Sequence, residues 1–168
     1  LKRLTWKNPN PYDSEAYYNL GLALFYQQKY QDAYDAFYKA SWSNEQQEMS
    51  FYYLACIAAR QGEWEAALEF AEKGLIKNSH NIKGRGLKAV ILRKLGRREE
   101  ALAWTAENLK IDPFDFLSGF EQYLLTEEQD ELEKLNGLMR NFHENYLMTA
   151  RDYGESGCFE EAAKLLAQ

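Results

Sequence analysis

The sequence predicts an all-α protein, a solenoid of stacked antiparallel helix hairpins. Two sets of small residues recur at intervals of 34 positions. They are Gly21, Ala55 and Ala89 in the first set and Ala33, Ala67 and Ala101 in the second. Within each half of a repeat, apolar residues lie three or four positions apart, which is the spacing of one helix face. A short polar turn such as Gln61-Gly62-Glu63 separates the halves. The repeating unit is therefore predicted to be helix, turn, helix.

The small residues are expected where the two helices of a hairpin cross. Two helices approach to about 8–10 Å only when the side chains between them are small. Large neighbours such as Leu20, Phe37 and Leu54 then fill the space beside the crossing. One hairpin cannot cover both of its faces, so consecutive hairpins must stack on one another.

Residues 14–115 resemble the tetratricopeptide repeat family three times over, in spacing and in residue type. The first repeat matches the family pattern with Tyr17, Leu20, Gly21, Leu24, Ala33 and Phe37. The third is the most degenerate, but its LGRREEALA and LKIDP segments follow the pattern closely. The resemblance implies a right-handed superhelix with one concave and one convex face.

After Pro113 the register changes and then returns. Residues 115–125 and 127–140 are expected to form a shortened hairpin, with Thr126 capping its second helix. The segment ENYLMTARDYGESGCFEEAAKLLAQ restores the repeat pattern. The expected organisation is a linker over 1–13 and a repeat domain over 14–168, with repeats at 14–47, 48–81 and 82–115, an irregular hairpin at 116–142 and a partial repeat at 143–168.

The chain also resembles the C-terminal repeat region of some large bacterial proteins. The segments LTWKNPNPYDSEAYYNLGLAL and NYLMTARDYGESGCFEEA carry this likeness. Those proteins have an uncharacterised N-terminal part that is thought to be sugar-related. On this resemblance the sequence is a domain fragment and residues 1–13 arrive from the upstream part. The likeness implies no activity for the repeats themselves.

Composition argues against an enzyme. Aromatic residues make up 15% of the chain, whereas there are only two His and two Cys among 168 residues. His80 and His143 have no partner at metal-ligand spacing. No GxSxG, phosphate-loop or HExxH motif is present. We expect no catalytic residue, no metal and no cofactor.

In this family, ligands lie in the concave groove, which the first helix of each hairpin lines. Mapped onto this chain, the groove is aromatic at one end and basic at the other. The expected partner contacts are Tyr18, Asn19, Phe25, Tyr26, Tyr52, Tyr53, Arg60, Arg93 and Lys94. Tyr and Arg are common binding hot spots, so we expect a polypeptide segment with an acidic group near the three cations. The alternative is that the tyrosines pack between helices and the cations are solvated.

A second functional hypothesis is intramolecular. The repeats would dock against, or orient, the upstream part of the same protein, and Trp6 and the linker would be ordered against the first repeat. The two hypotheses differ in whether the groove is open to solvent or filled by the chain's own segments.

The charge is unevenly distributed along the chain. Residues 1–113 carry 16 Lys/Arg and 14 Asp/Glu, a net charge of +2, and residues 114–168 carry 4 and 12, a net charge of −8. The basic run at 83–98 could contact phosphates, but the acidic second part would repel nucleic acid. We therefore expect a protein or peptide partner, no nucleic acid and no membrane, with the oligomeric state left open. Cys56 and Cys158 lack disulfide or metal spacing, which favours a reducing, cytoplasmic compartment.

Overall fold

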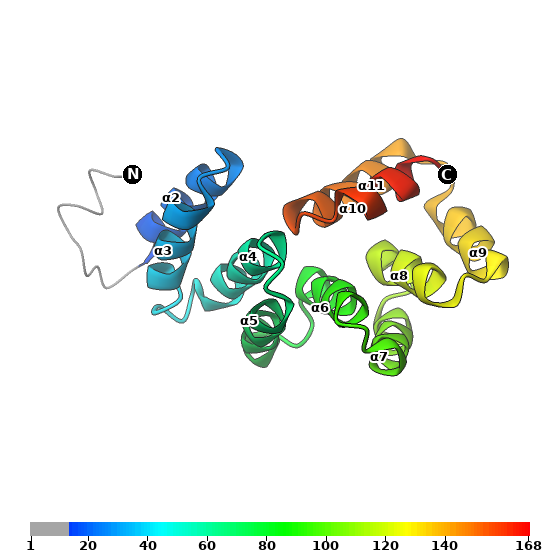
Figure 1. The fold of residues 1–168 in the computed structure, drawn as a ribbon, viewed down its shortest axis with the longest axis horizontal. Helices are drawn as coiled ribbons and strands as arrows, with labels where there is room; N and C mark the ends of the chain where they lie inside the picture. The colour runs from blue at the N-terminus through cyan, green and yellow to red at the C-terminus, as the bar shows by residue number, and fades with distance from the viewer. Residues whose placement is uncertain (1–13) are drawn as a thin grey trace.

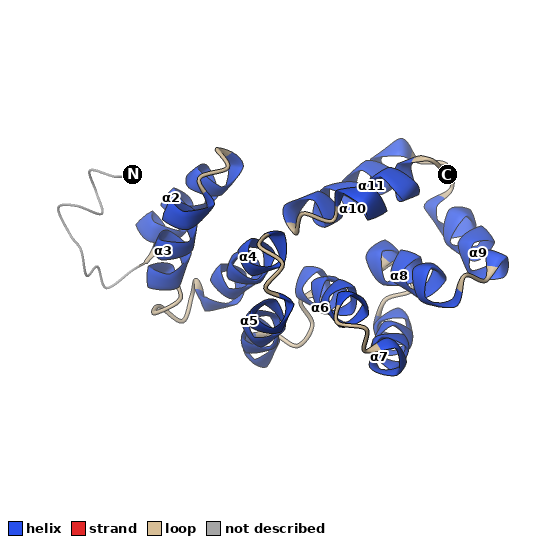
Figure 2. Cartoon of the chain, viewed as in Figure 1, coloured by secondary structure: helices blue, strands red, loops and turns tan. Residues whose placement is uncertain are grey.

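The computed structural model describes residues 14–168, and this part of the chain is entirely helical apart from its connections (Figures 1 and 2). The expected linker over 1–13, including Trp6, lies outside the described residues. The helices are α2 (Glu15–Tyr26), α3 (Tyr30–Ala40), α4 (Gln47–Arg60), α5 (Trp64–Lys77), α6 (Ile82–Lys94), α7 (Arg98–Ile111), α8 (Phe116–Thr126), α9 (Gln129–Met139), α10 (His143–Glu155) and α11 (Phe159–Leu166). They form five consecutive helix pairs over 14–168, as expected of an all-α solenoid.

The small residues of the repeat lie at the helix crossings, as predicted. The five alanines of the two sets are completely buried, and Gly21 is buried as well. A Cβ atom added to Gly21 would lie 2.7 Å from the ring of Phe37, so a larger residue does not fit between α2 and α3. The repeat is therefore a packing requirement, in which small residues on one helix make room for aromatic or aliphatic residues of its neighbour.

The turns inside the hairpins repeat too. Gln28, Gly62 and Gly96, again 34 residues apart, all adopt a left-handed backbone conformation with φ between 61° and 78°. Gly157 does the same between α10 and α11, with φ 80°. Glycine suits this conformation because it has no Cβ. The turn geometry places α10 and α11 in the same kind of hairpin as the first three repeats.

The second helix of the shortened hairpin begins later than the sequence predicts. Thr126 is the last residue of α8, and its hydroxyl donates to the carbonyl of Gln122 at 3.0 Å. Glu127 follows in a left-handed conformation, and α9 begins at Gln129 without a side-chain cap. The prediction that Thr126 caps this helix is wrong, because Thr126 ends α8 and its hydroxyl accepts from the amide of Glu128, at 3.3 Å, and not from an amide inside α9.

Two hydrophobic cores run through the described residues. The first core contains residues of all the helices from α2 through α7, together with Leu125 of α8. The second contains residues of the helices from α8 through α11, together with Val90 of α6. Figure 1 shows α10 and α11 lying across the side formed by α4, α6 and α8, while α5 and α7 lie on the opposite side. The chain thus curls back, and its last hairpin packs against the inner helices of the solenoid.

Candidate functional site

The expected groove residues lie on the inner helices α2, α4 and α6, but the structure does not expose them equally. Phe25, Tyr52 and Tyr53 are buried, whereas Tyr26 is 61% exposed. The remaining expected contacts are intermediate in exposure, namely Tyr18, Asn19, Arg60, Arg93 and Lys94. The groove is therefore accessible at its α2 end and covered further along.

Part of the aromatic set packs between helices. The ring of Tyr53 stacks on Phe37 with centroids 4.9 Å apart, and it meets Phe25 edge-on at 5.2 Å. Tyr18 lies against both rings of the stacked pair, with its centroid 5.8 Å from Phe37 and 6.4 Å from Tyr53. Burial raises the pKa of Tyr53 far above its usual range, so its hydroxyl stays protonated. For these rings the packing alternative describes the geometry, since they join α2, α3 and α4.

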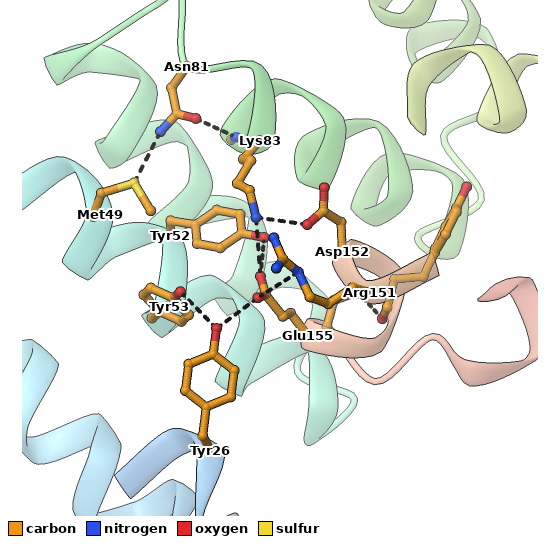
Figure 3. A network of polar contacts seen from close by, with 12 residues as sticks. Tyr26, Met49, Tyr52, Tyr53, Asn81, Lys83, Arg151, Asp152 and Glu155 are labelled. Carbon is orange, nitrogen blue, oxygen red and sulfur yellow. Dashed lines mark hydrogen bonds and ion pairs between the residues drawn. The ribbon is translucent and has the colours of Figure 1, made fainter. Parts of the chain in front are cut away.

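A buried carboxylate occupies the middle of the groove. Glu155, the last residue of α10, is only 4% exposed. Figure 3 shows Tyr26, Tyr52 and Lys83 directed towards its carboxylate. Its carboxylate accepts hydrogen bonds from the hydroxyls of Tyr52 at 2.9 Å and Tyr26 at 3.1 Å. The ammonium of Lys83 lies 3.7 Å away and also pairs with Asp152 of α10 at 2.8 Å. Tyrosines from α2 and α4 and a lysine from α6 therefore converge on one end of α10.

The side chain of Arg60 binds backbone carbonyls at the same end of α10. Its Nε donates to the carbonyl of Glu155 at 2.9 Å, and its Nη2 donates to the carbonyl of Gly154. The guanidinium also lies over the rings of Tyr30, at 4.7 Å, and Phe159, at 5.3 Å. The C-terminal carbonyls of a helix carry a partial negative charge, so a cation is the complementary group there.

Arg93 and Lys94 bind a second acidic group. Both nitrogens of the Arg93 fork contact the carboxylate of Glu121 in α8, at 2.6 and 3.1 Å. Glu161 of α11 lies 2.9 Å from Arg93 and 2.5 Å from Lys94. Tyr153 donates its hydroxyl to Glu121 at 2.7 Å. A second network of charges therefore joins α6 and α8 to the last hairpin.

The ionisation of this network follows from those contacts. Burial disfavours the charged form of Glu161, but hydrogen bonds from Lys94 and Arg93 outweigh it and lower the pKa of Glu161 to about 2. Burial also disfavours the charged form of Arg93, yet its bonds to Glu121 raise the pKa of Arg93 above its usual value. Both groups are charged at neutral pH.

The sequence predicted six residues of this site as groove residues, but it did not predict the acidic residues that lie against them. Tyr26, Tyr52, Tyr53, Arg60, Arg93 and Lys94 all lie at or near α10 and α11. Asp152, Glu155 and Glu161 were not singled out, because their proximity depends on the last hairpin folding back. The one sequence signal was the excess of acid after residue 113, opposite a mildly basic first part.

The basic run at 83–98 pairs with carboxylates in the structure. Beyond Lys83, Arg93 and Lys94, already described, the pairs are Arg85 with Glu107, Lys88 with Glu72, and Arg97 with Glu100. These cations therefore have carboxylate partners within the chain.

Neither a metal-binding cluster nor an activated thiol is found among the described residues. Within 14–168, no three His, Cys, Asp or Glu side chains gather as they would around a metal ion. Burial raises the pKa of the Cys56 thiol well above its usual value, which makes it a poor nucleophile. The groove instead presents hydroxyls, cations and rings that suit a carboxylate or a helix end. No helix among the described residues has the length and apolar character that a membrane span requires.

Comparison with known proteins gives the fold a family context. No protein-family model matches the sequence. Among solved structures, YrrB, titled "a TPR protein with an unusual peptide-binding site", superposes with a TM-score of 0.68 at 15% identity, covering 99% of this chain and 88% of its own.

Two further solved structures agree. MamA from Desulfovibrio magneticus RS-1 gives a TM-score of 0.66 at 14% identity, covering 92% of this chain and 91% of its own. A tetratricopeptide repeat protein from Parabacteroides merdae gives 0.69 at 21% identity, covering 98% and 67%. The repeat spacing, the buried small residues and these superpositions agree, and the chain has the fold of tetratricopeptide repeat proteins.

Proposed function

We propose that this chain is a non-catalytic protein-interaction scaffold, whose concave groove binds a polypeptide segment through tyrosines and cations. The observation that carries the proposal is the convergence on α10, where Tyr26, Tyr52, Lys83 and Arg60 hold a carboxylate and a helix end. A groove that binds a segment of its own chain in this way has the groups needed to bind a similar segment of a partner.

The α2 end of the groove is the place for first contact with a partner. Tyr26 exposes 61% of its surface, and Tyr18 and Asn19 are half-buried about two turns earlier on the same helix. Tyrosine supplies large contact area with few rotatable bonds, which favours binding. The description of YrrB as a protein with a peptide-binding site supports the same use of this fold.

The test is a screen of a peptide array, followed by affinity measurements on each peptide that binds. Tyr26→Ala and Asn19→Ala are expected to weaken binding about tenfold, which corresponds to roughly 1.4 kcal/mol. The control is Tyr38→Ala, which removes a 49% exposed tyrosine from α3, outside the expected groove set. Peptide binding that responds equally to all three substitutions, or to none, would contradict the proposal.

The intramolecular alternative has support of its own. The chain's own hairpin covers much of the groove, so these repeats bind a segment of the same protein through it. An upstream part of the protein could dock on the α2 end in the same manner. Hydrogen exchange of the full gene product and of the repeats alone tests this. Protection of α2 only in the longer protein supports docking, and identical exchange rules against it.

A further inference from the structure

We propose that the surface beneath the last hairpin recognises one kind of partner, a helix that ends in a glutamate and is followed by a glycine turn and a second glutamate. The surface consists of Tyr52, Arg60, Lys83, Arg93 and Lys94. The chain's own α10 and α11 are its internal occupant, and a partner segment of the same chemistry displaces them. This inference rests on the proposed function and names the class of its ligand.

The surface binds a helix end and not only a charge. Arg60 donates to the last two carbonyls of α10, those of Gly154 and Glu155, which lie at the negative end of the helix. An extended peptide presents its carbonyls on alternating sides, so it does not offer two adjacent acceptors in this direction. The arginine therefore selects a helical ligand.

The surface also selects glycine after the helix. Gly157 has φ 80°, and a Cβ atom there would lie 2.9 Å from Cγ and 3.3 Å from Cα of Arg60. Other residues are disfavoured twice, by the left-handed backbone and by the close approach of Arg60. Glycine two positions after the terminal glutamate is therefore part of what is recognised.

Two carboxylates complete the ligand. Glu155 accepts from the hydroxyl of Tyr52 and lies near Lys83, and Glu161, six residues later, pairs with Arg93 and Lys94. These donors come from α4 and α6, so the repeats contact both carboxylates, and within the hairpin Arg151 lies 3.9 Å from Glu155. Both are buried in the complex that the chain makes with itself, with 4% and 5% of their surface exposed.

The internal occupant is attached in a way that permits exchange. Three residues join α9 to α10, and two of them, Arg140 and Asn141, adopt left-handed conformations without being glycine. Contacts with α4 and α6 include buried charges, whose attraction is largely offset by the loss of hydration, beside the apolar contact of Tyr153 with Phe120 of α8. One oxygen of Glu161, Oε2, is buried without a hydrogen-bond partner. The hairpin is therefore held less firmly than the apolar repeats beneath it.

The experiment supplies the hairpin in trans. A labelled peptide of residues 143–168 is titrated against the full chain and against the full chain carrying Gly157→Ala. The substitution weakens docking of the internal hairpin and leaves every groove residue unchanged. Apparent affinity scales with the fraction of chains whose surface is free, so the variant is expected to bind the peptide at least about tenfold more tightly than the wild type.

Matched probes test each recognition element. Peptides carrying Glu155→Gln, Glu161→Gln or Gly157→Ala are each expected to bind the variant chain about tenfold more weakly than the unaltered peptide. A peptide carrying Glu160→Gln, an exposed neighbour, is the control and should bind as the unaltered peptide does. Arg60→Ala in the receiving chain should reduce the preference for glycine at position 157 of the peptide to the part that the left-handed backbone alone requires.

Equal affinity of the peptide for wild type and variant, or equal binding of all the peptides, overturns the inference. If Gly157→Ala leaves the chain unfolded by circular dichroism, Glu155→Gln in the full chain serves as the receiver, with the same expectations. Failure here does not affect the proposed function if array peptides still depend on Asn19 at the α2 end. The opposite result is that array peptides no longer depend on Asn19 while the 143–168 peptide still binds the chain. That result would contradict the proposed function and leave the hairpin as the only ligand of this surface.

Discussion

Gly21 and Phe37 show how a single residue sets the packing of a repeat. The ring of Phe37 occupies the space that a side chain at position 21 would need, and it is itself completely buried. Tyr53 of the next repeat stacks on the other side of this ring. One small residue thus allows a chain of contacts from the first hairpin into the second.

Gly21→Ala is predicted to destabilise the protein by about 1–3 kcal/mol, because the added methyl overpacks the crossing of α2 and α3. Urea denaturation followed by circular dichroism measures the change in the free energy of unfolding. Gly137→Ala is the matched control, since no atom lies within 4 Å of the added Cβ and alanine favours the helical conformation of α9. We expect it to be neutral or stabilising by up to about 1 kcal/mol. A Gly21 variant as stable as the Gly137 variant would refute the packing argument.

At the scale of elements, the α10–α11 hairpin has the sequence pattern of a repeat but lies in the groove, where the family binds its ligands. Tyr146, Ala150 and Tyr153 follow the spacing of the earlier repeats, and Gly157 forms the expected turn. Tyr153 packs edge-on against Phe120 of α8, which anchors the hairpin by apolar contact. The C-terminal end of α10 contacts α4 through Arg60. The hairpin therefore bridges the irregular hairpin and the second repeat.

Arg60→Ala is predicted to loosen this hairpin selectively. The carbonyls of Gly154 and Glu155 lose a charged donor, which costs about 2 kcal/mol. Native-state hydrogen exchange should show faster opening of α10 and α11, with little change in α6 and α7. Arg98→Ala, at an exposed arginine that begins α7, is the control and should leave exchange in the hairpin unchanged. Uniform acceleration across all helices would show that Arg60 supports the whole fold and not this one element.

At the scale of the whole molecule, the uneven charge of the chain becomes complementarity within it. Lys83, Arg93 and Lys94 belong to the part with a net charge of +2, and their carboxylate partners belong to the part with a net charge of −8. Arg93 also links the two hydrophobic cores, because it lies on α6 and contacts α8 and α11. Opposite charges on the two parts thus favour the folding back that covers the groove.

This arrangement predicts a specific dependence of stability on pH. Glu161 has a pKa of about 2 in the folded protein, below the value near 4.5 of an unperturbed glutamate. Its contribution is complete above pH 4.5 and is lost as the pH falls towards 2. The difference corresponds to about 3 kcal/mol. Urea denaturation between pH 6 and pH 2 should show this loss in the wild type, and Glu161→Gln should be less stable at pH 6 with a flatter profile.

Glu160→Gln provides the comparison for that profile, because Glu160 is exposed on the same turn of α11. It should follow the wild-type curve closely. If the Glu161 variant also follows the wild-type curve through this range, the carboxylate does not hold the hairpin by charge, and the network around Arg93 has another origin.

The sequence by itself determined the fold of the repeats. The period of 34, the small residues at Gly21, Ala55 and Ala89, and the polar turns are local features. Helix geometry and close packing translate them directly into hairpins that stack on their neighbours. It also identified tyrosines and cations on the inner helices, because helical periodicity places them on one face.

Only the tertiary structure decided what those residues contact. Glu155 lies 103 positions from Tyr52 in the chain, and no local pattern relates them. Their contact depends on the path of the whole solenoid, on the shortened hairpin that redirects it, and on a glycine that allows Arg60 to approach α10. Such contacts arise from the sum of many small rotations between helices, so repeat spacing determines the scaffold but not how the last hairpin closes on it.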